Sequence, residues 1–145
     1  MKINVEQLKV QHLIGLDMRG VQRAQHWVVD AMKNPQWFET MVNSGPCCAF
    51  IDPRGVAAIG GIIEFKGTGR GIVWAIFAHD SGEHFVSLYR KMRRAMLSVK
   101  LNRYEAYINP EFKQARRLAS ISGFVREGLM RRHENGIDKE LWALT

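Results

Sequence analysis

Residues 72–78, with the sequence IVWAIFA, constrain the fold more than any other part of the chain. Every position in this short segment is apolar, which is typical of a β-strand that is covered on both of its faces. A short polar loop follows, and then a long segment with helical spacing of apolar residues. We therefore expect a central strand that leads into a helix, within a sheet that carries helices on both faces.

The length and composition favour one globular domain. A chain of 145 residues can bury a core of its own, and a hydrophobic content of 46% with well-mixed charges argues against disorder. We expect residues 1–145 to form a single domain. The sequence shows no signal peptide and no run near the roughly 20 apolar residues of a membrane helix, so a cytoplasmic protein without membrane contact is predicted.

Changes in hydrophobic period divide the chain into strands and helices. Helical spacing predicts helices at 17–32, 36–42, 80–99 and 110–121. Extended patterns predict strands at 2–8, 47–51, 56–65, 72–78, 103–109, 125–133 and 138–144. This order favours an α/β fold with a mixed central sheet of about seven strands.

The last predicted helix has strong local signals at both ends. Asn109 suits the N-cap, Pro110 suits the first helical position, and Gly123 suits the left-handed residue that ends a helix. Four apolar side chains at helical spacing are expected to face the core: Phe112, Ala115, Leu118 and Ile121.

Two tight turns and a pair of cysteines add local detail. The sequence DPRG at 52–55 predicts one hairpin, and Asn135 followed by Gly136 predicts another. Cys47 and Cys48 are neighbours in a predicted strand, where successive side chains point to opposite faces. A disulfide between them is therefore not expected, and the other ligands of a zinc site are lacking, so no metal is predicted.

The order of elements resembles the GCN5-related N-acetyltransferase family over nearly the whole chain. The segment VAAIGGIIEF resembles the third strand of that fold, and IVWAIFAHDSGEHFVSLYRKMRRAM resembles the strand, loop and helix that bind acetyl-CoA. ARRLASISGFVRE is similar to the late helix of the family, with the pattern Ala, two residues, Leu-Tyr, three residues, Gly-Phe. Four residues match this pattern: Ala115, Leu118, Gly123 and Phe124. The short chain with altered motifs is similar to members of the family in tailed bacteriophages.

The resemblance implies acetyl-CoA as a cosubstrate, bound between strands 72–78 and 103–109. Members of the family hold its pyrophosphate with backbone N–H groups at the start of a helix, which favours an anion. The sequence HDSGEH at 79–84 stands in this place, where Asp80 and Glu83 add negative charge. A backbone N–H near Phe77 or Ala78 would stabilise the oxyanion. The implied cofactor-binding residues are Phe77, Ala78, His79, Ser81, Gly82, Glu83, His84 and Asn109.

The tyrosine that commonly protonates the departing thiolate in this family is replaced by Ala119. Another group must take this role, or the fold is kept without the reaction. His79 can accept a proton near neutral pH, and Glu64 or Glu105 could do so if burial raised its pKa. Tyr107 is a candidate replacement acid. The alternative interpretation is that His79 is an exposed loop residue and that Glu64 and Glu105 are solvated strand residues, none of them with a catalytic role.

The formal net charge of +7 favours an acidic partner, and the run YRKMRRAMLSVKLNR carries much of it. Such a run can attract an acidic protein, the 3′-phosphate of coenzyme A or a nucleic acid; nucleic acid is the less favoured partner, because basic runs are more often solvated helix faces. The expected function is acetyl-CoA-dependent transfer of an acetyl group to an amine of a small molecule or protein. The alternative is a catalytically inactive, virion-associated or other binding protein of the same fold that acts through a protein partner.

Overall fold

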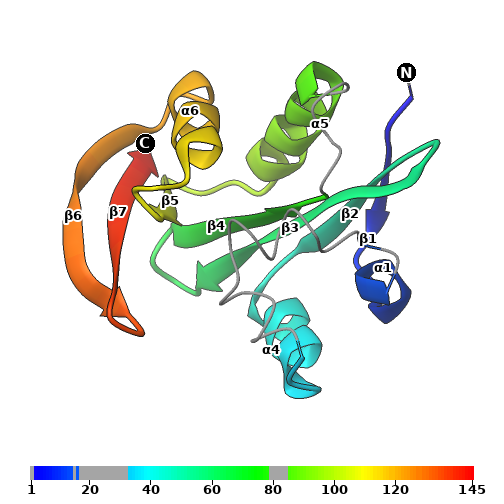
Figure 1. The fold of residues 1–145 in the computed structure, drawn as a ribbon, viewed down its shortest axis with the longest axis horizontal. Coiled ribbons are helices and arrows are strands. Elements are labelled where there is room, and N and C mark those ends of the chain that lie inside the picture. The colour runs from blue at the N-terminus through cyan, green and yellow to red at the C-terminus, as the bar shows by residue number, and fades with distance from the viewer. Residues whose placement is uncertain (1, 15, 17–32, 79–84) are drawn as a thin grey trace. The chain divides into compact units, whose positions relative to one another are not determined.

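The computed structural model describes residues 2–14, 16, 33–78 and 85–145 (Figure 1). Seven strands form one sheet in the order β1-β2-β3-β4-β5-β7-β6. The strands are β1 (Asn4–Gln7), β2 (Cys47–Asp52), β3 (Gly55–Phe65), β4 (Arg70–Phe77), β5 (Arg103–Ile108), β6 (Val125–Glu134) and β7 (Ile137–Leu144). β4 and β5 are parallel, whereas β2 with β3 and β6 with β7 are antiparallel. The predicted mixed sheet of seven strands is confirmed.

The described helices are α1 (Val10–Ile14), α4 (Gln36–Ser44), α5 (Phe85–Ser98) and α6 (Lys113–Ile121). The predicted helix at 17–32 and the predicted helix start at 80–84 lie outside the described residues. Helix α1 was not predicted. None of the described helices combines the length and the apolar character that crossing a membrane requires.

Helix α6 begins three residues later than predicted. The backbone oxygen of Asn109 accepts the N–H of Phe112 at 2.9 Å, and its side-chain oxygen accepts the N–H of Glu111 at 3.0 Å. These two bonds close a turn before the helix, so Asn109 caps that turn instead of the helix.

The described residues fall into two compact units, the first formed by Met1–Ile63 and Ala75–Val99 and the second by Glu64–Trp74 and Lys100–Thr145. In the first unit, Figure 1 shows α5 on one face of β2 and β3 and α4 on the other. The core on the α5 side contains Ile3, Phe50, Ala57, Ala58 and Leu88, with Cys48, Phe77, Met92 and Ala95 packed against it. Burial of these side chains is the main stabilisation of α5 on the sheet.

Side chains along β2 point alternately to the two faces of the sheet and contact a helix on each. Cys48 packs against the core on the α5 side, whereas the thiol of Cys47 donates to the backbone oxygen of Met41 in α4 at 3.4 Å. The prediction that the two cysteines point to opposite faces is therefore confirmed, and both are free thiols.

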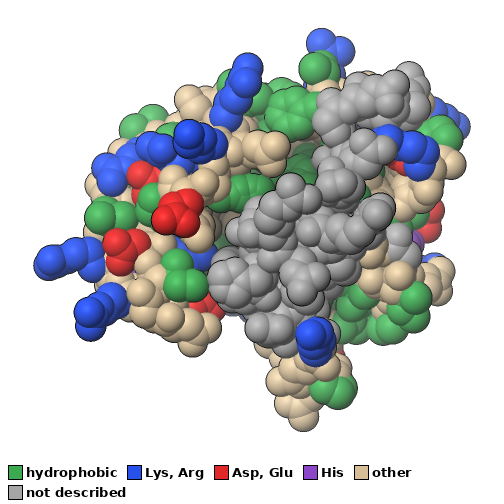
Figure 2. Space-filling view, in the orientation of Figure 1, with side chains coloured by type: hydrophobic (Ala, Val, Ile, Leu, Met, Phe, Trp, Pro, Cys, Tyr) green, Lys and Arg blue, Asp and Glu red, His purple; other side chains and the backbone are tan. Residues whose placement is uncertain are grey.

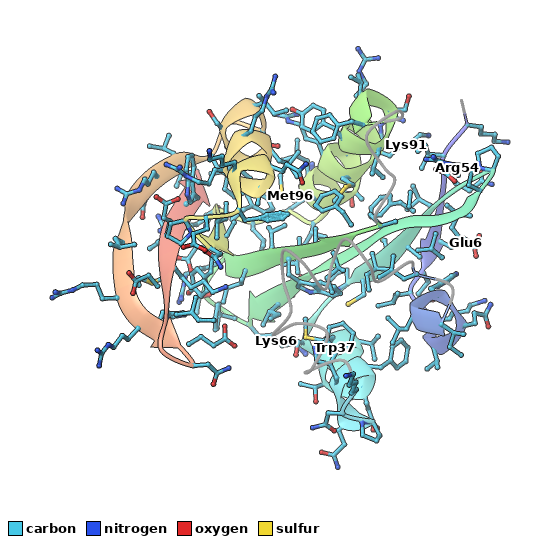
Figure 3. All side chains as sticks on the ribbon, viewed as in Figure 1. Glu6, Trp37, Arg54, Lys66, Lys91 and Met96 are labelled. Carbon is cyan, nitrogen blue, oxygen red and sulfur yellow. The ribbon has the colours of Figure 1, made fainter. Side chains whose placement is uncertain are left out.

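The hairpin between β2 and β3 forms at the predicted DPRG turn. The side chain of Asp52 accepts the N–H of Arg54 at 2.8 Å and binds its guanidinium at 3.0 Å, and Figure 3 labels Arg54 at this tip. The register then slips, since Ile51 pairs with Val56 while Phe50 pairs with Ala58. Ala57 is the extra residue of this bulge.

Strand β1 differs from its predicted pattern. A strand was predicted at 2–8, but the observed strand spans Asn4–Gln7 and all four of its residues are exposed. Burial falls instead on Ile3 and Leu8, which flank the strand. The reason is that β1 stands at one end of the strand order, so its own side chains meet little of the core.

In the second unit, helix α6 ends as Gly123 predicted. Gly123 has a φ of +94°, its N–H donates to the oxygen of Ser120, and the N–H of Phe124 donates to the oxygen of Ala119. These are the two bonds of a Schellman motif. The buried face is rotated from the expected one, because Ala119 is buried and Ile121 is 49% exposed.

The sheet register of the second unit separates two sets of side chains. Glu140 of β7 pairs with Ile108 of β5 and reaches Arg116 of α6, so α6 covers this face. Residues two apart share a face of a strand, so Glu105 and Tyr107 lie on the opposite face. Asn135 and Gly136 both have positive φ, as expected for the turn that joins β6 and β7.

Candidate functional site

Glu105 is the centre of a charged cluster at the start of β5. Its side chain is 6% exposed, and its Oε2 atom accepts hydrogen bonds from Arg70 Nε at 3.0 Å and Arg103 Nε at 2.6 Å. The parallel ladder pairs Arg70 with Arg103. Paired residues project to the same face, so the register of β4 and β5 brings two guanidinium groups to one carboxylate.

The pKa of Glu105 moves in the direction opposite to the one that a base requires. Burial raises the pKa, but the hydrogen bonds and charges of Arg103 and Arg70 together hold it below its ordinary value of 4.5. The interpretation of Glu105 as a base with a raised pKa is therefore not supported. A carboxylate that stays ionised in this way is a poor proton acceptor near neutral pH.

Tyr107 belongs to the same cluster. Its hydroxyl donates to Glu105 Oε1 at 3.4 Å, and its ring meets the ring of His133 edge-on with centroids 5.1 Å apart. Glu105 and Tyr107, both predicted as site residues, are thus brought together. The carboxylate of Glu105 thus holds the phenol of Tyr107 in a fixed orientation.

Arg70, Arg103 and Glu127 belong to this cluster, but no recognisable signal in the sequence pointed to them. Arg103 donates with both terminal nitrogens to the carboxylate of Glu127, at 3.0 and 2.5 Å. The guanidinium of Arg70 stacks over the ring of Phe65 at 4.2 Å. Arg70 lies 35 residues from Glu105, so local patterns could not have identified the pair.

A second buried carboxylate lies on the face that α6 covers. Glu140 accepts a hydrogen bond from Arg126 Nε at 2.7 Å and one from Trp142 Nε1 at 3.3 Å. Arg116 Nε lies 2.9 Å from Glu140 Oε1 as an ion pair without hydrogen-bond alignment. Burial raises the pKa of Glu140, but these partners lower it overall. This cluster ties α6 to β6 and β7 and has a structural role.

The end of β4 only partly fits the predicted oxyanion role. The N–H of Ala78 donates to the backbone oxygen of Ala57 at 2.8 Å, so this donor is already used and the expectation for its N–H is wrong. Phe77 packs its side chain against the core on the α5 side. Its backbone N–H stays the candidate oxyanion donor.

The remaining predicted residues are placed as follows. Asn109 uses its side-chain oxygen within its own turn, which leaves its amide nitrogen as the group for a cofactor. Glu64 is half-buried near the end of β3. The other predicted cofactor contacts and the predicted base lie outside the described residues: His79, Ser81, Gly82, Glu83 and His84.

In the described part of the chain, the two thiols are not activated as nucleophiles, and the acidic side chains are not grouped to hold a metal ion. Burial, with a smaller contribution from Cys48, raises the pKa of Cys47 to about 11, and burial raises that of Cys48. Neither cysteine is an activated nucleophile. Within the described ranges, no three histidine, cysteine or acidic side chains are grouped to hold a metal ion.

Ala119, which occupies the position of the tyrosine expected from the family resemblance, has a structural role. Ala119 is 6% exposed, and its backbone oxygen accepts the N–H of Phe124 at the end of α6. A small side chain packs here in the interior of the second unit, so the helix offers no acid at this point.

Comparison with solved structures identifies the fold. A ribosomal-protein-S5-alanine acetyltransferase from Vibrio fischeri matches with a TM-score of 0.71 and 13% identity over 99% of this chain and 93% of that one. A spermidine N-acetyltransferase from Vibrio cholerae, in complex with CoA and spermine, matches with a TM-score of 0.70 and 15% identity over 98% and 94%. No protein-family model and no curated protein matches the sequence. The chain therefore has the fold of these N-acetyltransferases.

Proposed function

We propose that the protein transfers an acetyl group from acetyl-CoA to an amine of a small molecule or protein. The observation that carries this proposal is the fold, which matches N-acetyltransferases over nearly the whole length of both chains. One of those structures is a complex with CoA and spermine. Acetyl-CoA is accordingly the proposed cosubstrate, and an amine is the proposed acceptor.

The reaction needs two proton transfers that the protein must arrange. The amine nitrogen forms a bond to the acetyl carbon, the carbon–sulfur bond breaks, the amine loses a proton and the thiolate gains one. Tyr107 is the proposed donor to the thiolate, since its hydroxyl is oriented by Glu105. The phenol has one proton, so its O–H must turn from Glu105 to the leaving thiolate to act as a general acid. Glu105 then positions Tyr107, and His79 remains the proposed base.

The loop at 79–84 is the proposed holder of the cofactor. Ser81, Gly82, Glu83 and His84 precede α5, where backbone N–H groups at a helix start attract phosphate. Cofactor binding depends on these N–H groups outweighing the acidic side chains of Asp80 and Glu83.

Binding is the first test of this proposal. Isothermal titration of acetyl-CoA, with coenzyme A as the comparison, is expected to show saturable binding at micromolar concentration. Absence of heat and of thermal stabilisation at millimolar acetyl-CoA would rule out the acetyltransferase function. If binding is found, spermine, spermidine, and a peptide with an N-terminal alanine are the first acceptors to assay.

Two matched variants then test the acid. Tyr107→Phe should lower kcat by about 10²-fold or more while acetyl-CoA affinity is kept. Tyr104→Phe is the control, because Tyr104 lies in the same strand but projects to the other face. Equal kcat values for the two variants would remove Tyr107 from the mechanism. A kcat of Tyr107→Phe that equals the wild-type value would do the same.

The buried alanine at position 119 favours a second candidate function. The fold can serve as a non-catalytic binding protein that acts through a protein partner, because the late helix has lost its acid. This function predicts that variants of Glu64, His79 and Tyr107 all keep activity in a partner-binding assay, and that acetyl-CoA does not bind.

A further inference from the structure

The outer face of α5 is a strongly basic surface. Arg90, Arg93 and Arg94 are exposed, and their spacing of three and four residues places them on one side of the helix. Leu88 and Met92 face the core on the other side. Figure 2 shows lysine and arginine side chains projecting from the upper part of the surface, where α5 lies, and Figure 3 labels Lys91 and Met96 on different sides of α5.

No acidic residue occurs in the sequence between Phe85 and Leu101, whereas this stretch contains Arg90, Lys91, Arg93, Arg94 and Lys100. Within the part of the chain that the structure describes, no carboxylate forms an ion pair with any of the three exposed arginines. Like charges at these spacings repel one another and weaken a helix. The first unit therefore keeps a repulsive arrangement that a bound polyanion would relieve.

The arginines of the second unit behave differently. Four of them form ion pairs with glutamate side chains of the same unit: Arg70, Arg103, Arg116 and Arg126. Internal pairing is therefore a solution that this chain uses elsewhere, and the three arginines of the α5 face do not use it among the described residues.

We infer that the α5 face, defined as Arg90, Arg93 and Arg94, binds the phosphate backbone of a nucleic acid without reading its sequence. Guanidinium groups form paired hydrogen bonds with phosphate, and such contacts need no apolar surface. A protein interface instead requires a buried core rich in aromatic side chains. The outer side of α5 offers Val86, which is 59% exposed, and no exposed aromatic residue.

The spacing also fits a backbone. Residues 90 and 94 are about 6 Å apart along the helix axis, so their long side chains can reach separate phosphates. About three phosphates can thus be contacted at once. Arginine can also contact guanine edges in the major groove, so the inference concerns contacts with the phosphate backbone alone.

Fluorescence anisotropy with a labelled 20-nucleotide RNA and a labelled 20-base-pair DNA tests this inference, which does not depend on acetyl transfer. For the wild-type protein, log Kobs should fall linearly with log salt concentration, with a slope of about −3 on duplex DNA. The variant Arg90→Ala/Arg93→Ala/Arg94→Ala should bind at least tenfold more weakly at 50 mM salt and lose most of that slope. The two nucleic acids show whether single-stranded RNA or duplex DNA is preferred.

The matched control is Lys113→Ala/Arg117→Ala/Arg131→Ala. This control also removes three positive charges, but from exposed positions outside α5. Its affinity for nucleic acid should stay within about twofold of that of the wild type. Thermal unfolding followed by circular dichroism shows that both variants fold.

Several results would overturn the inference. One is that the wild-type protein does not bind nucleic acid at 50 mM salt. Another is that the two triple variants lose affinity equally, which would assign the effect to net charge. Displacement of the nucleic acid by polyglutamate at equal charge concentration would reassign the face to an acidic protein. Displacement by coenzyme A, together with loss of its binding in the α5 variant, would assign these arginines to the cofactor.

Discussion

The buried clusters of the second unit and the α5 face of the first unit use arginine in two different ways. In the second unit, guanidinium groups surround the buried carboxylates of Glu105 and Glu140 and fix strands and a helix to one another. On α5 of the first unit, three arginines extend into solvent without such partners among the described residues. The comparison teaches that net charge alone says little about binding, because only unpaired charge is available to a ligand.

The two roles predict different responses to mutation, and the largest concerns Glu105. Glu105→Ala should lower the free energy of unfolding by about 2 kcal/mol, because Arg70 and Arg103 lose their shared acceptor. Urea unfolding followed by fluorescence measures this change. Glu127→Ala is the control: Glu127 is 40% exposed, so its loss should cost clearly less than the loss of Glu105. Equal effects would show that burial of Glu105 adds nothing.

Acid should weaken the second unit by a smaller amount. The folded-state pKa values of Glu105 and Glu140 are below the ordinary 4.5. Each carboxylate therefore contributes stability that is fully present above pH 4.5 and is lost as the pH falls through the folded-state pKa. Unfolding free energy measured from pH 7 to pH 3 should fall, and the fall should be shallower in Glu105→Gln/Glu140→Gln. An unchanged pH dependence in that variant would contradict this assignment.

The smallest effect is expected on α5. Arg94→Ala should change the free energy of unfolding by no more than about 0.5 kcal/mol, and in the stabilising direction at low salt, since it removes a repulsion with Arg90. Urea unfolding at 20 mM and 500 mM salt measures the effect, which should shrink at the higher concentration. A clear destabilisation would mean that Arg94 is paired, and the contrast between the two units would fail.

Much of the fold could be predicted from the sequence because its signals are local. The apolar run at 72–78, the DPRG turn, the Asn135 and Gly136 pair and the Gly123 stop each depend on neighbouring residues. Helix α6 shows the limit of such signals. Asn109 and Pro110 carry every mark of a helix start, yet a turn that ends at Phe112 occupies this place.

The candidate site depended more on distant contacts. Tyr107 and Glu105 are two residues apart in a predicted strand, and side chains at this spacing share a face. Burial raises the pKa of Glu105, and Arg103 and Arg70 together lower it. Arg70 comes from a neighbouring strand, so sequence patterns do not reveal its contact with Glu105. The same is true of Ala78, whose N–H is bound by Ala57 across the bulged part of β3.

Because Cys47 and Cys48 point in opposite directions, their thiols are two separate probes of local opening. Cys48 is covered from the α5 side and Cys47 lies against α4. Cys47 is buried and Cys48 is half-buried, and burial raises the pKa of both thiols, so local opening should speed their alkylation at neutral pH. In the variants Cys47→Ala and Cys48→Ala, the alkylation rate of the remaining thiol reports how often one particular helix leaves the sheet. Adjacent positions in one strand can thus time the separate movements of two helices.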